Sequence, residues 1–422
     1  MARLSIRHAV FFFAFALLTV LFLHLRVVLE SRRLSLGTNT SNTPGGAADS
    51  NLKANPTVLD EELATQSAMS KKPASQLNLA SVIGARTSLF SFRSATQSRS
   101  ADPVDLPFYE DAALGTSSIK RVLIQIHGQG RDADVNWREA AEARAEAASK
   151  SGGQLSVKDV LVIAPLFFNG NDKERFGWQG KGSTGQLLVW KGNGLSSPQW
   201  GEGEPNQYPH REKTVSSFEA LDAMLRYYSD RARFPNVESI VVSGHSLGGQ
   251  MVHRYAILSD LPLSSPVKLS FIVANPSTFL YLDGDRPRPG SNDDDDDAKH
   301  VEGYNHYKYG LEGIDDSLGE YFRLLGTAQQ GGKALWRRFT QEREVHYIEG
   351  DRDHGVGDER PQAYAQGKDR IDRLKNYIAW ASSPERGGHW PEGHTVEWAP
   401  GVAHDAGGIL KSEAGLRRAF LD

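Results

Sequence analysis

Cysteine is absent from the 422 residues of this sequence, and its absence excludes three kinds of site. The chain can form no disulfide, offer no thiolate to a metal and use no cysteine nucleophile, whatever compartment it occupies. An excess of basic charge is also lacking, because the formal net charge is -4 at pH 7. Binding a phosphate backbone requires clustered Lys and Arg, so no nucleic-acid partner is expected.

One long apolar run stands near the N-terminus, over residues 9–23, and it follows Arg3 and Arg7. About 20 apolar residues span a bilayer as a helix, and a few apolar residues beyond the run extend it towards that length. No small-x-small cleavage site follows, so residues 1–30 are expected to form an uncleaved signal anchor, with a cleaved signal peptide as the alternative. A glycosylation sequon at Asn39 favours a single-pass membrane protein with a lumenal or extracellular catalytic domain, or a secreted protein.

Residues 31–102 are rich in Ser, Thr, Ala, Asn and Gly, and they are predicted to be a mostly disordered linker. Such a segment buries too little apolar surface to offset the entropy lost on ordering. Residues 103–422 are predicted to be the folded domain. Within it, the five consecutive aspartates Asp293–Asp297 are interpreted as a solvated loop, because consecutive ligands do not converge on one calcium ion.

Strands and helices alternate from about residue 120 onwards. Short β-branched runs predict strands at Arg121–Ile126, Asp159–Pro165, Ser239–Gly244, Lys268–Asn275, Glu344–Gly350 and His394–Pro400. Helical spacing of apolar residues predicts helices at Asp134–Lys150, Gly248–Leu258 and Pro361–Ser382. Near-continuous apolar strands alternating with helices indicate a mostly parallel sheet covered on both faces, an α/β fold. Active sites in such sheets lie at the carboxyl ends of the strands, so candidate residues are sought there.

The stretch VVSGHSLGGQM places Ser246 between a predicted strand and a predicted helix, with Gly244 and Gly248 two residues away on either side. With 41 glycines in the chain, this five-residue pattern could arise by chance, or as a structural turn or phosphate-binding turn. The glycine fingerprints of dinucleotide and nucleotide loops are absent from it. A serine on such a sharp turn projects above the sheet, so Ser246 is predicted to be a nucleophile.

A serine hydroxyl needs a base, and the base needs an acid that orients it. Among 13 histidines, His404 follows the last predicted strand and is chosen as the base. His245 adjoins the nucleophile, but its side chain is expected to point away along the turn. The acid is predicted to be Asp353, with Asp351 second and Asp283 third.

Two backbone N–H groups are expected to stabilise the oxyanion that forms during attack. One is that of Leu247, immediately after the nucleophile. The other is that of Gln129, in the HGQG stretch after the first strand of the regular region. No cofactor and no metal site are expected, because the strand-end loops supply a serine triad and not a set of converging metal ligands.

With these motifs in order, residues 103–422 resemble the α/β-hydrolase superfamily of serine hydrolases. The matching stretches are HGQG, GHSLGG, GDRD and PGVAHD, and the order Ser, Asp, His is that of the superfamily. NPSTFLYLDG and YNHYKYGL are similar to stretches of an uncharacterised fungal and bacterial branch. The resemblance implies an α/β-hydrolase fold with inserted cap or loop segments.

The expected activity is cleavage of a carboxylic ester through an acyl-enzyme on Ser246. An amidase or peptidase, an acyltransferase and a catalytically silent binding protein with this fold stay open as alternatives. Residues 166–211 carry seven Phe, Trp and Tyr side chains and are interpreted as a pocket wall for a small-molecule or lipid-like acyl substrate, or else as a satellite core. Residues 280–339 are long enough to form a helical cap.

Overall fold

The computed structural model describes residues 69–98, 101–181, 185–192, 199–262, 267–286 and 300–422. Every described residue belongs to one compact unit. The predicted signal anchor, the sequon and the five-aspartate run lie outside the described residues. Within the described ranges, no helix has the length and hydrophobicity needed to cross a membrane.

The strands are β1 (Ser70–Pro73), β2 (Ala85–Phe92), β3 (Val104–Asp111), β4 (Arg121–Ile126), β5 (Val160–Pro165), β6 (Phe168–Asn169), β7 (Val189–Trp190), β8 (Ser239–His245), β9 (Lys268–Ala274), β10 (Glu344–Gly350) and β11 (His394–Ala399). The α-helices are α3 (Ala133–Lys150), α4 (Ser217–Ser229), α5 (Leu247–Leu258), α6 (Ile314–Leu318), α7 (Gly326–Gln329), α8 (Gly332–Glu342), α9 (Pro361–Tyr364), α10 (Arg370–Ala381), α11 (Ala406–Lys411) and α12 (Glu413–Leu416). The six strands predicted from the sequence are therefore all present, with ends that agree within one residue.

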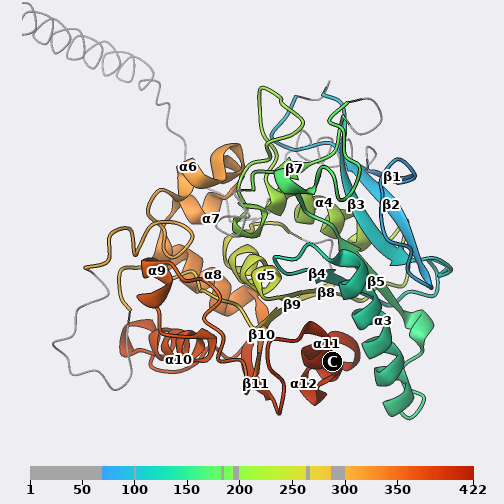
Figure 1. Cartoon of the computed structure of the whole chain (residues 1–422). Coiled ribbons are helices and arrows are strands. Elements are labelled where there is room, and N and C mark those ends of the chain that lie inside the picture. Colours follow the sequence, from blue (N-terminus) through green and yellow to red (C-terminus); the bar gives the residue numbers. More distant parts are fainter. Residues whose placement is uncertain (1–68, 99–100, 182–184, 193–198, 263–266, 287–299) are drawn as a thin grey trace, which may run out of the picture. The chain divides into compact units, whose positions relative to one another are not determined.

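A nine-stranded sheet in the order β1-β2-β3-β5-β4-β8-β9-β10-β11 forms the centre of the described structure (Figure 1). Pairing is parallel from β5 through β11, and antiparallel among β1, β2, β3 and β5. The expected α/β fold, a mostly parallel sheet flanked by helices, is confirmed. The carboxyl ends of β4, β8, β9, β10 and β11 therefore meet at one edge, where loops from distant parts of the chain can share a site.

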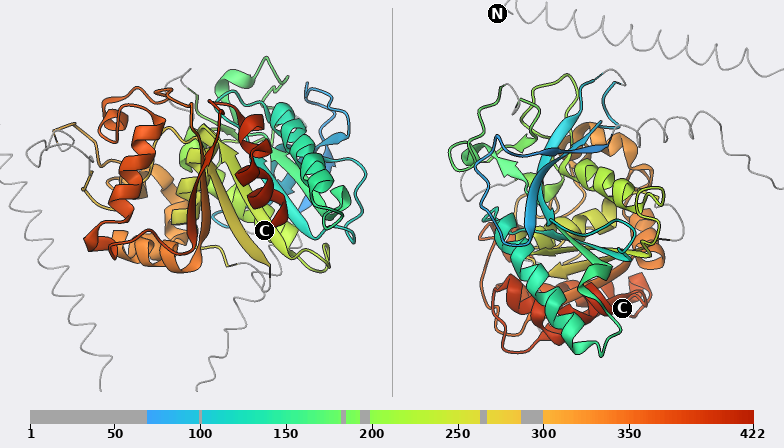
Figure 2. Two further views of the ribbon diagram at one scale, coloured as in Figure 1. Left: turned by 90° about the horizontal axis from the view of Figure 1, so that it is seen from below. Right: turned by 90° about the vertical axis from the view of Figure 1, so that its right-hand side faces the viewer.

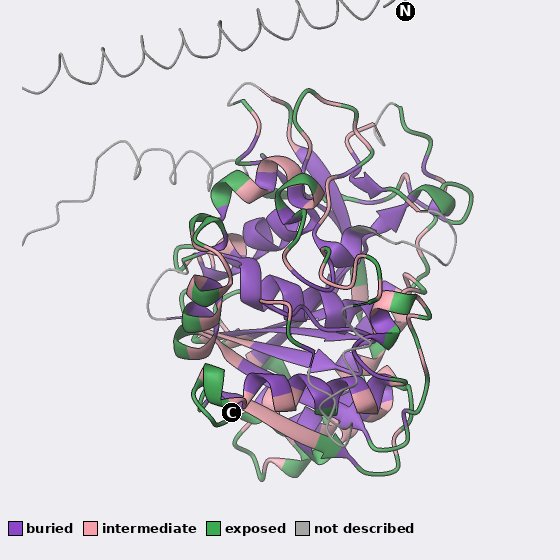
Figure 3. Cartoon of the chain, turned by 90° about the vertical axis from the view of Figure 1, so that its left-hand side faces the viewer, coloured by how far each residue is buried: buried purple, intermediate pink, exposed green. Residues whose placement is uncertain are grey.

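The two faces of this sheet bury separate apolar cores, because side chains alternate along each strand. In β4, Val122 and Ile124 pack in the core that includes α4, α5, α8 and α10, whereas Leu123 packs in the core that includes α3, α11 and α12. Figure 2 shows the helices on the two sides of the sheet, and Figure 3 shows its central strands mostly buried, whereas the edge strands β1 and β11 are mostly intermediate or exposed. The sheet is thus fixed from both sides, which holds its strand ends rigid.

The prediction of a mostly disordered linker at residues 31–102 is wrong from residue 69 onwards, because β1 and β2 lie within it and belong to the sheet. β2 pairs with β3 in antiparallel register, and Phe90 and Phe92 of β2 are fully buried. Phe90 makes edge contacts with the rings of Phe108 and Tyr227. Serine and threonine dominate the composition of this segment, but a few aromatic side chains find partners on β3 and α4. The folded domain therefore begins before residue 103.

The single helix predicted at Pro361–Ser382 is instead two helices, α9 and α10, separated by residues 365–369. Gly367 adopts φ +147°, outside the helical region. Asp369 then caps α10, because its side chain accepts a hydrogen bond from the backbone N–H of Asp372. This break makes Arg370 the first residue of α10 and directs it towards the strand ends.

Candidate active site

Ser246 occupies a sharp turn between β8 and α5. Its φ of 60° and ψ of -118° are strained for a residue with a side chain. The turn is also tight: a Cβ at Gly244 would lie 2.3 Å from the carbonyl oxygen of Gly248, and one at Gly248 would lie 2.4 Å from that of Ile126. Only glycine fits at these two positions, so the flanking glycines are explained by the close approach of backbone and not by chance.

His404 and Asp353 are joined by a hydrogen bond of 2.6 Å between Nδ1 and Oδ2. They lie in the loops after β11 and β10, which are neighbouring parallel strands. Burial opposes ionisation of Asp353, but the hydrogen bond from His404 and the charge of Arg370 outweigh it and lower the pKa of Asp353 to about 2. An ionised carboxylate on Nδ1 fixes the imidazole so that Nε2 is the basic nitrogen.

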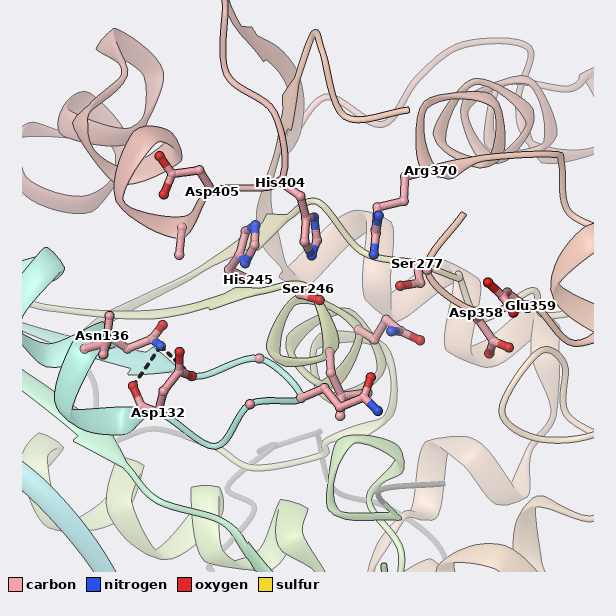
Figure 4. A pocket seen from close by; sticks show the side chains of 18 of the residues that line it. Asp132, Asn136, His245, Ser246, Ser277, Asp358, Glu359, Arg370, His404 and Asp405 are labelled. Atoms are coloured by element: carbon pink, nitrogen blue, oxygen red, sulfur yellow. Dashed lines mark hydrogen bonds between the residues drawn. The ribbon is translucent and has the colours of Figure 1, made fainter. Parts of the chain in front are cut away.

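His404 and Ser246 line one cavity, in which both side chains face the same space (Figure 4). Among the described residues no hydrogen bond joins the Ser246 hydroxyl to the His404 ring. Such contacts are often long in a substrate-free site and tighten when substrate binds. The arrangement therefore places a serine on a sharp turn and an oriented imidazole at the wall of one cavity.

The other two candidate acids have different roles. Asp351 is exposed and accepts a hydrogen bond from the backbone N–H of Gly401, which ties the loops after β10 and β11 together. Asp283 accepts one from the indole of Trp380 and pairs with Arg386. Of the three predicted candidates, the structure brings Asp353 alone to His404.

Asn275 is a site residue that the sequence analysis missed. Its side-chain amide donates to Asp353 Oδ2 at 2.7 Å and to the backbone carbonyl of Ala403 at 3.1 Å, while its oxygen accepts from the backbone N–H of Gly350. The Asn275 side chain thus bonds to Asp353 and to both of the loops that carry Asp353 and His404. The available signal was its position, since Asn275 ends the run KLSFIVAN at the carboxyl end of β9.

The loop after β4 is held by side chains that bind three successive carbonyl groups. His127 contacts the carbonyl of Gly128 at 2.8 Å, Arg131 donates to that of Gln129 at 2.6 Å, and Arg175 donates to that of Gly130 at 2.7 Å. Burial lowers the pKa of His127 to about 4, so its ring is neutral, and its Nε2 accepts from the backbone N–H of Phe167. Nδ1 is therefore the protonated nitrogen that donates to Gly128.

This arrangement orients the N–H of Gln129. The carbonyl of Gly128 and the N–H of Gln129 belong to one trans peptide unit and point in opposite directions. Gln129 and Leu247, the two predicted oxyanion donors, both line the cavity beside Ser246. Leu247 is the first residue of α5, so its N–H has no acceptor within the helix.

His245 does not point away from the site, contrary to expectation. Its ring packs on that of His404 with centroids 4.4 Å apart, and it lines the same cavity (Figure 4). Burial, followed by the adjacent charge of His404, lowers the pKa of His245 to about 3. Among the described residues no carboxylate bonds to this neutral ring, which supports His404 by packing, so the two neighbouring histidines are not equivalent as bases.

The cavity has a volume of about 830 Å³, and most of the residues that line it are polar or charged. Of the two interpretations of the aromatic segment 166–211, the pocket wall is wrong, because none of its described residues lines this cavity. The core interpretation is supported, because Phe167 and Trp200 are buried and their rings stack with centroids 5.4 Å apart. Of the described residues in the expected cap, 280–339, Lys308 lines the cavity. The charged side chains around it are Asp132, Glu139, Lys308, Asp358, Glu359, Arg360, Arg370 and Asp405.

No family model matches the chain, and a comparison with curated proteins finds no match. Among solved structures, the chain is similar to poly(aspartic acid) hydrolase-1 from Sphingomonas sp. KT-1, with 20% identity and a TM-score of 0.47 over 78% of this chain and 96% of that one. It is also similar to a poly(3-hydroxybutyrate) depolymerase from Bordetella parapertussis, with 18% identity and a TM-score of 0.45 over 79% and 94% of the two chains. The substrates in these names are properties of those proteins alone.

Proposed function

We propose that this protein is a serine hydrolase that cleaves a carboxylic ester through an acyl-enzyme on Ser246. The observation that carries the proposal is the Asp353–His404 hydrogen bond of 2.6 Å in the cavity that also contains Ser246 on its strained turn. A serine alone is a poor nucleophile, and a histidine alone is most often a surface or core residue. An ionised acid, an oriented imidazole and a serine on a sharp turn together are the parts that acyl transfer requires.

In the first half-reaction, Ser246 Oγ attacks the ester carbonyl and its proton passes to His404 Nε2. The negative charge that forms on the carbonyl oxygen is stabilised by the N–H groups of Gln129 and Leu247. The tetrahedral intermediate collapses, the C–O bond to the alcohol breaks, and His404 returns the proton to the departing oxygen. Water, deprotonated by His404, then attacks the acyl-enzyme, which releases the acid and restores Ser246.

Asp353 stays ionised through this cycle, because its pKa of about 2 lies far below neutral pH. It therefore stabilises the imidazolium form of His404 without exchanging a proton itself. Asn275 and Arg370 contribute by keeping the carboxylate charged and in place.

The test is fluorophosphonate labelling of the full chain, together with hydrolysis of short p-nitrophenyl esters. Ser246→Ala is expected to abolish labelling, and Asp353→Asn is expected to lower kcat by about 10⁴-fold, because the amide no longer fixes the correct imidazole tautomer. The matched control is Asp351→Asn, which alters the neighbouring acid and is expected to retain most activity. Labelling at another serine, or equal losses in the two Asp variants, would contradict the assignment.

A further inference from the structure

Arg370 is a buried cation with unused hydrogen-bond donors in the wall of the active-site cavity. It is 7% exposed, and one of its terminal nitrogens, Nη1, donates to Asp353 Oδ1 at 3.2 Å. Among the described residues, neither Nε nor Nη2 has an acceptor, and Nε is fully buried. A guanidinium has five N–H donors, so most of the donors of Arg370 have no acceptor within the described protein.

Two glycines of the loop after β10 leave room for this guanidinium. A Cβ at Gly355 would lie 2.4 Å from Nη1 of Arg370, and a Cβ at Gly357 would lie 2.7 Å from Nη2 and 2.4 Å from the hydroxyl oxygen of Ser277. Gly357, Ser277 and Arg370 all line the cavity. Figure 4 shows the Arg370 side chain directed towards Ser277, on the side of the cavity that holds His404. Nη2 and the serine hydroxyl therefore lie side by side at the cavity wall.

The other two lysine or arginine side chains that line the described cavity are already paired. Lys308 contacts Glu202 at 2.9 Å and Asp358 at 3.2 Å. Arg360 donates to the two oxygens of Asp358 at 2.8 Å and 2.6 Å. Their charges are compensated within the protein, whereas Arg370 shares Asp353 with both His404 and Asn275.

We propose that Arg370, with Ser277 beside it, binds a carboxylate group of the substrate, so that the enzyme acts on esters that carry a second, ionised carboxyl group. The inference rests on the proposed esterase activity and names its substrate class. A buried guanidinium without its full set of acceptors is costly, and a carboxylate supplies both the missing negative charge and planar acceptor oxygens. A neutral alkyl group at this place would leave the donors of Nη2 without partners.

The competing explanation is that Arg370 serves Asp353 alone and never contacts the substrate. Loss of Arg370 would then impair the triad equally for every ester. Binding of a substrate carboxylate predicts instead a loss confined to charged substrates. A ratio of rates for two matched substrates separates the two explanations, because any effect on the triad cancels from it.

The experiment measures kcat/KM of the full chain for two matched pairs of esters. One pair has the charge in the acyl part: the 4-methylumbelliferyl half-ester of adipic acid and its methyl-capped form. The other pair has the charge in the alcohol part. It consists of the butyrate ester of 4-hydroxybenzoic acid and the butyrate ester of methyl 4-hydroxybenzoate. The parent is expected to prefer the carboxylate in at least one pair, and Arg370→Met is expected to reduce that preference by about 10- to 100-fold.

Arg360→Gln is the matched control, since it removes a cavity cation that is already paired with Asp358, and it is expected to leave the preference unchanged. A parent with no preference in either pair, or equal losses for both members in Arg370→Met, would overturn the carboxylate site while the esterase activity stands. A parent that hydrolyses none of the four esters would contradict the proposed function, and the carboxylate site with it.

Discussion

The carboxylate of Asp353 accepts hydrogen bonds from four different residues of the site. It accepts hydrogen bonds from His404 and Asn275 on one oxygen, and from Arg370 and the backbone N–H of Gly355 on the other. Asp351, two residues earlier, has none of these partners. The sequence GDRD contains both aspartates on one short loop, and local pattern cannot tell which one faces His404. The choice depends on three side chains that lie far apart in the sequence.

The depressed pKa of Asp353 predicts a pH dependence of stability. The pKa of Asp353 in the folded chain is about 2, below the value of about 3.9 in an unfolded chain. Ionised Asp353 therefore stabilises the fold at pH values above about 3.9. This contribution is lost as pH falls towards 2, because both states then bind the proton. The gap in Tm between the parent and Asp353→Asn is therefore expected to be largest near neutral pH and to narrow below about pH 4. Melting curves over this range test it, and a gap that is constant with pH would contradict it.

At the scale of elements, the active site depends on the junction of β4, β8 and α5. The backbone of α5 approaches the end of β4 so closely that Gly248 nearly touches the carbonyl of Ile126. This contact places the first turn of α5 against the loop that carries Gln129. The distance between the two predicted oxyanion donors is thus set by packing of a helix on a strand, and not by either loop alone.

Gly244→Ala is expected to test this junction. The new methyl group would lie 2.3 Å from the carbonyl oxygen of Gly248, so α5 must shift or the turn must open. We expect the free energy of unfolding to fall by about 1–3 kcal/mol and ester hydrolysis to fall with it. Gly115→Ala is the control, because no atom lies within 4 Å of a Cβ at that position. Denaturant titrations with kinetics on both variants measure the effect; equal stability of the two would refute the steric argument.

At the scale of the whole molecule, the sheet extends further towards the N-terminus than composition suggests. β1 and β2 continue it through antiparallel pairs, and the aromatic side chains of β2 complete one of the two cores. The predicted membrane anchor concerns residues outside the described structure and stays a prediction. The residues proposed to be catalytic lie in another part of the same sheet, in the loops after β4, β8, β10 and β11.

Two truncated chains test where the domain begins. A chain of residues 69–422 is expected to fold cooperatively and to retain hydrolysis. A chain of residues 103–422 loses β1 and β2, and with them Phe90 and Phe92, each of which contributes about 1.5–3 kcal/mol by burial. Because domains are stable by only about 5–15 kcal/mol, this loss is expected to lower Tm strongly or prevent folding. Circular dichroism melts of both chains provide the measurement, and equal Tm values would argue against a structural role for β1 and β2.

The sequence by itself determined the parts of this protein that depend on local pattern. Apolar runs gave the six strands, and glycine spacing gave the turn at Ser246 with a strand before it and a helix after it. Position after a strand was enough to choose His404, since parallel strands place their carboxyl ends at one edge.

Tertiary structure alone decided what depends on partners distant in the chain. It joined Asp353, the first-ranked of the predicted acids, to His404, added Asn275, turned His245 towards the site and buried Phe167 and Trp200 of the 166–211 segment in the core. It also divided the helix predicted at Pro361–Ser382 in two, so that Arg370 begins α10 and lines the cavity. The physical reason is the same in each case. The hydrogen bonds and ring contacts of the site join residues as far apart in the sequence as His245 and His404, and no local periodicity encodes them.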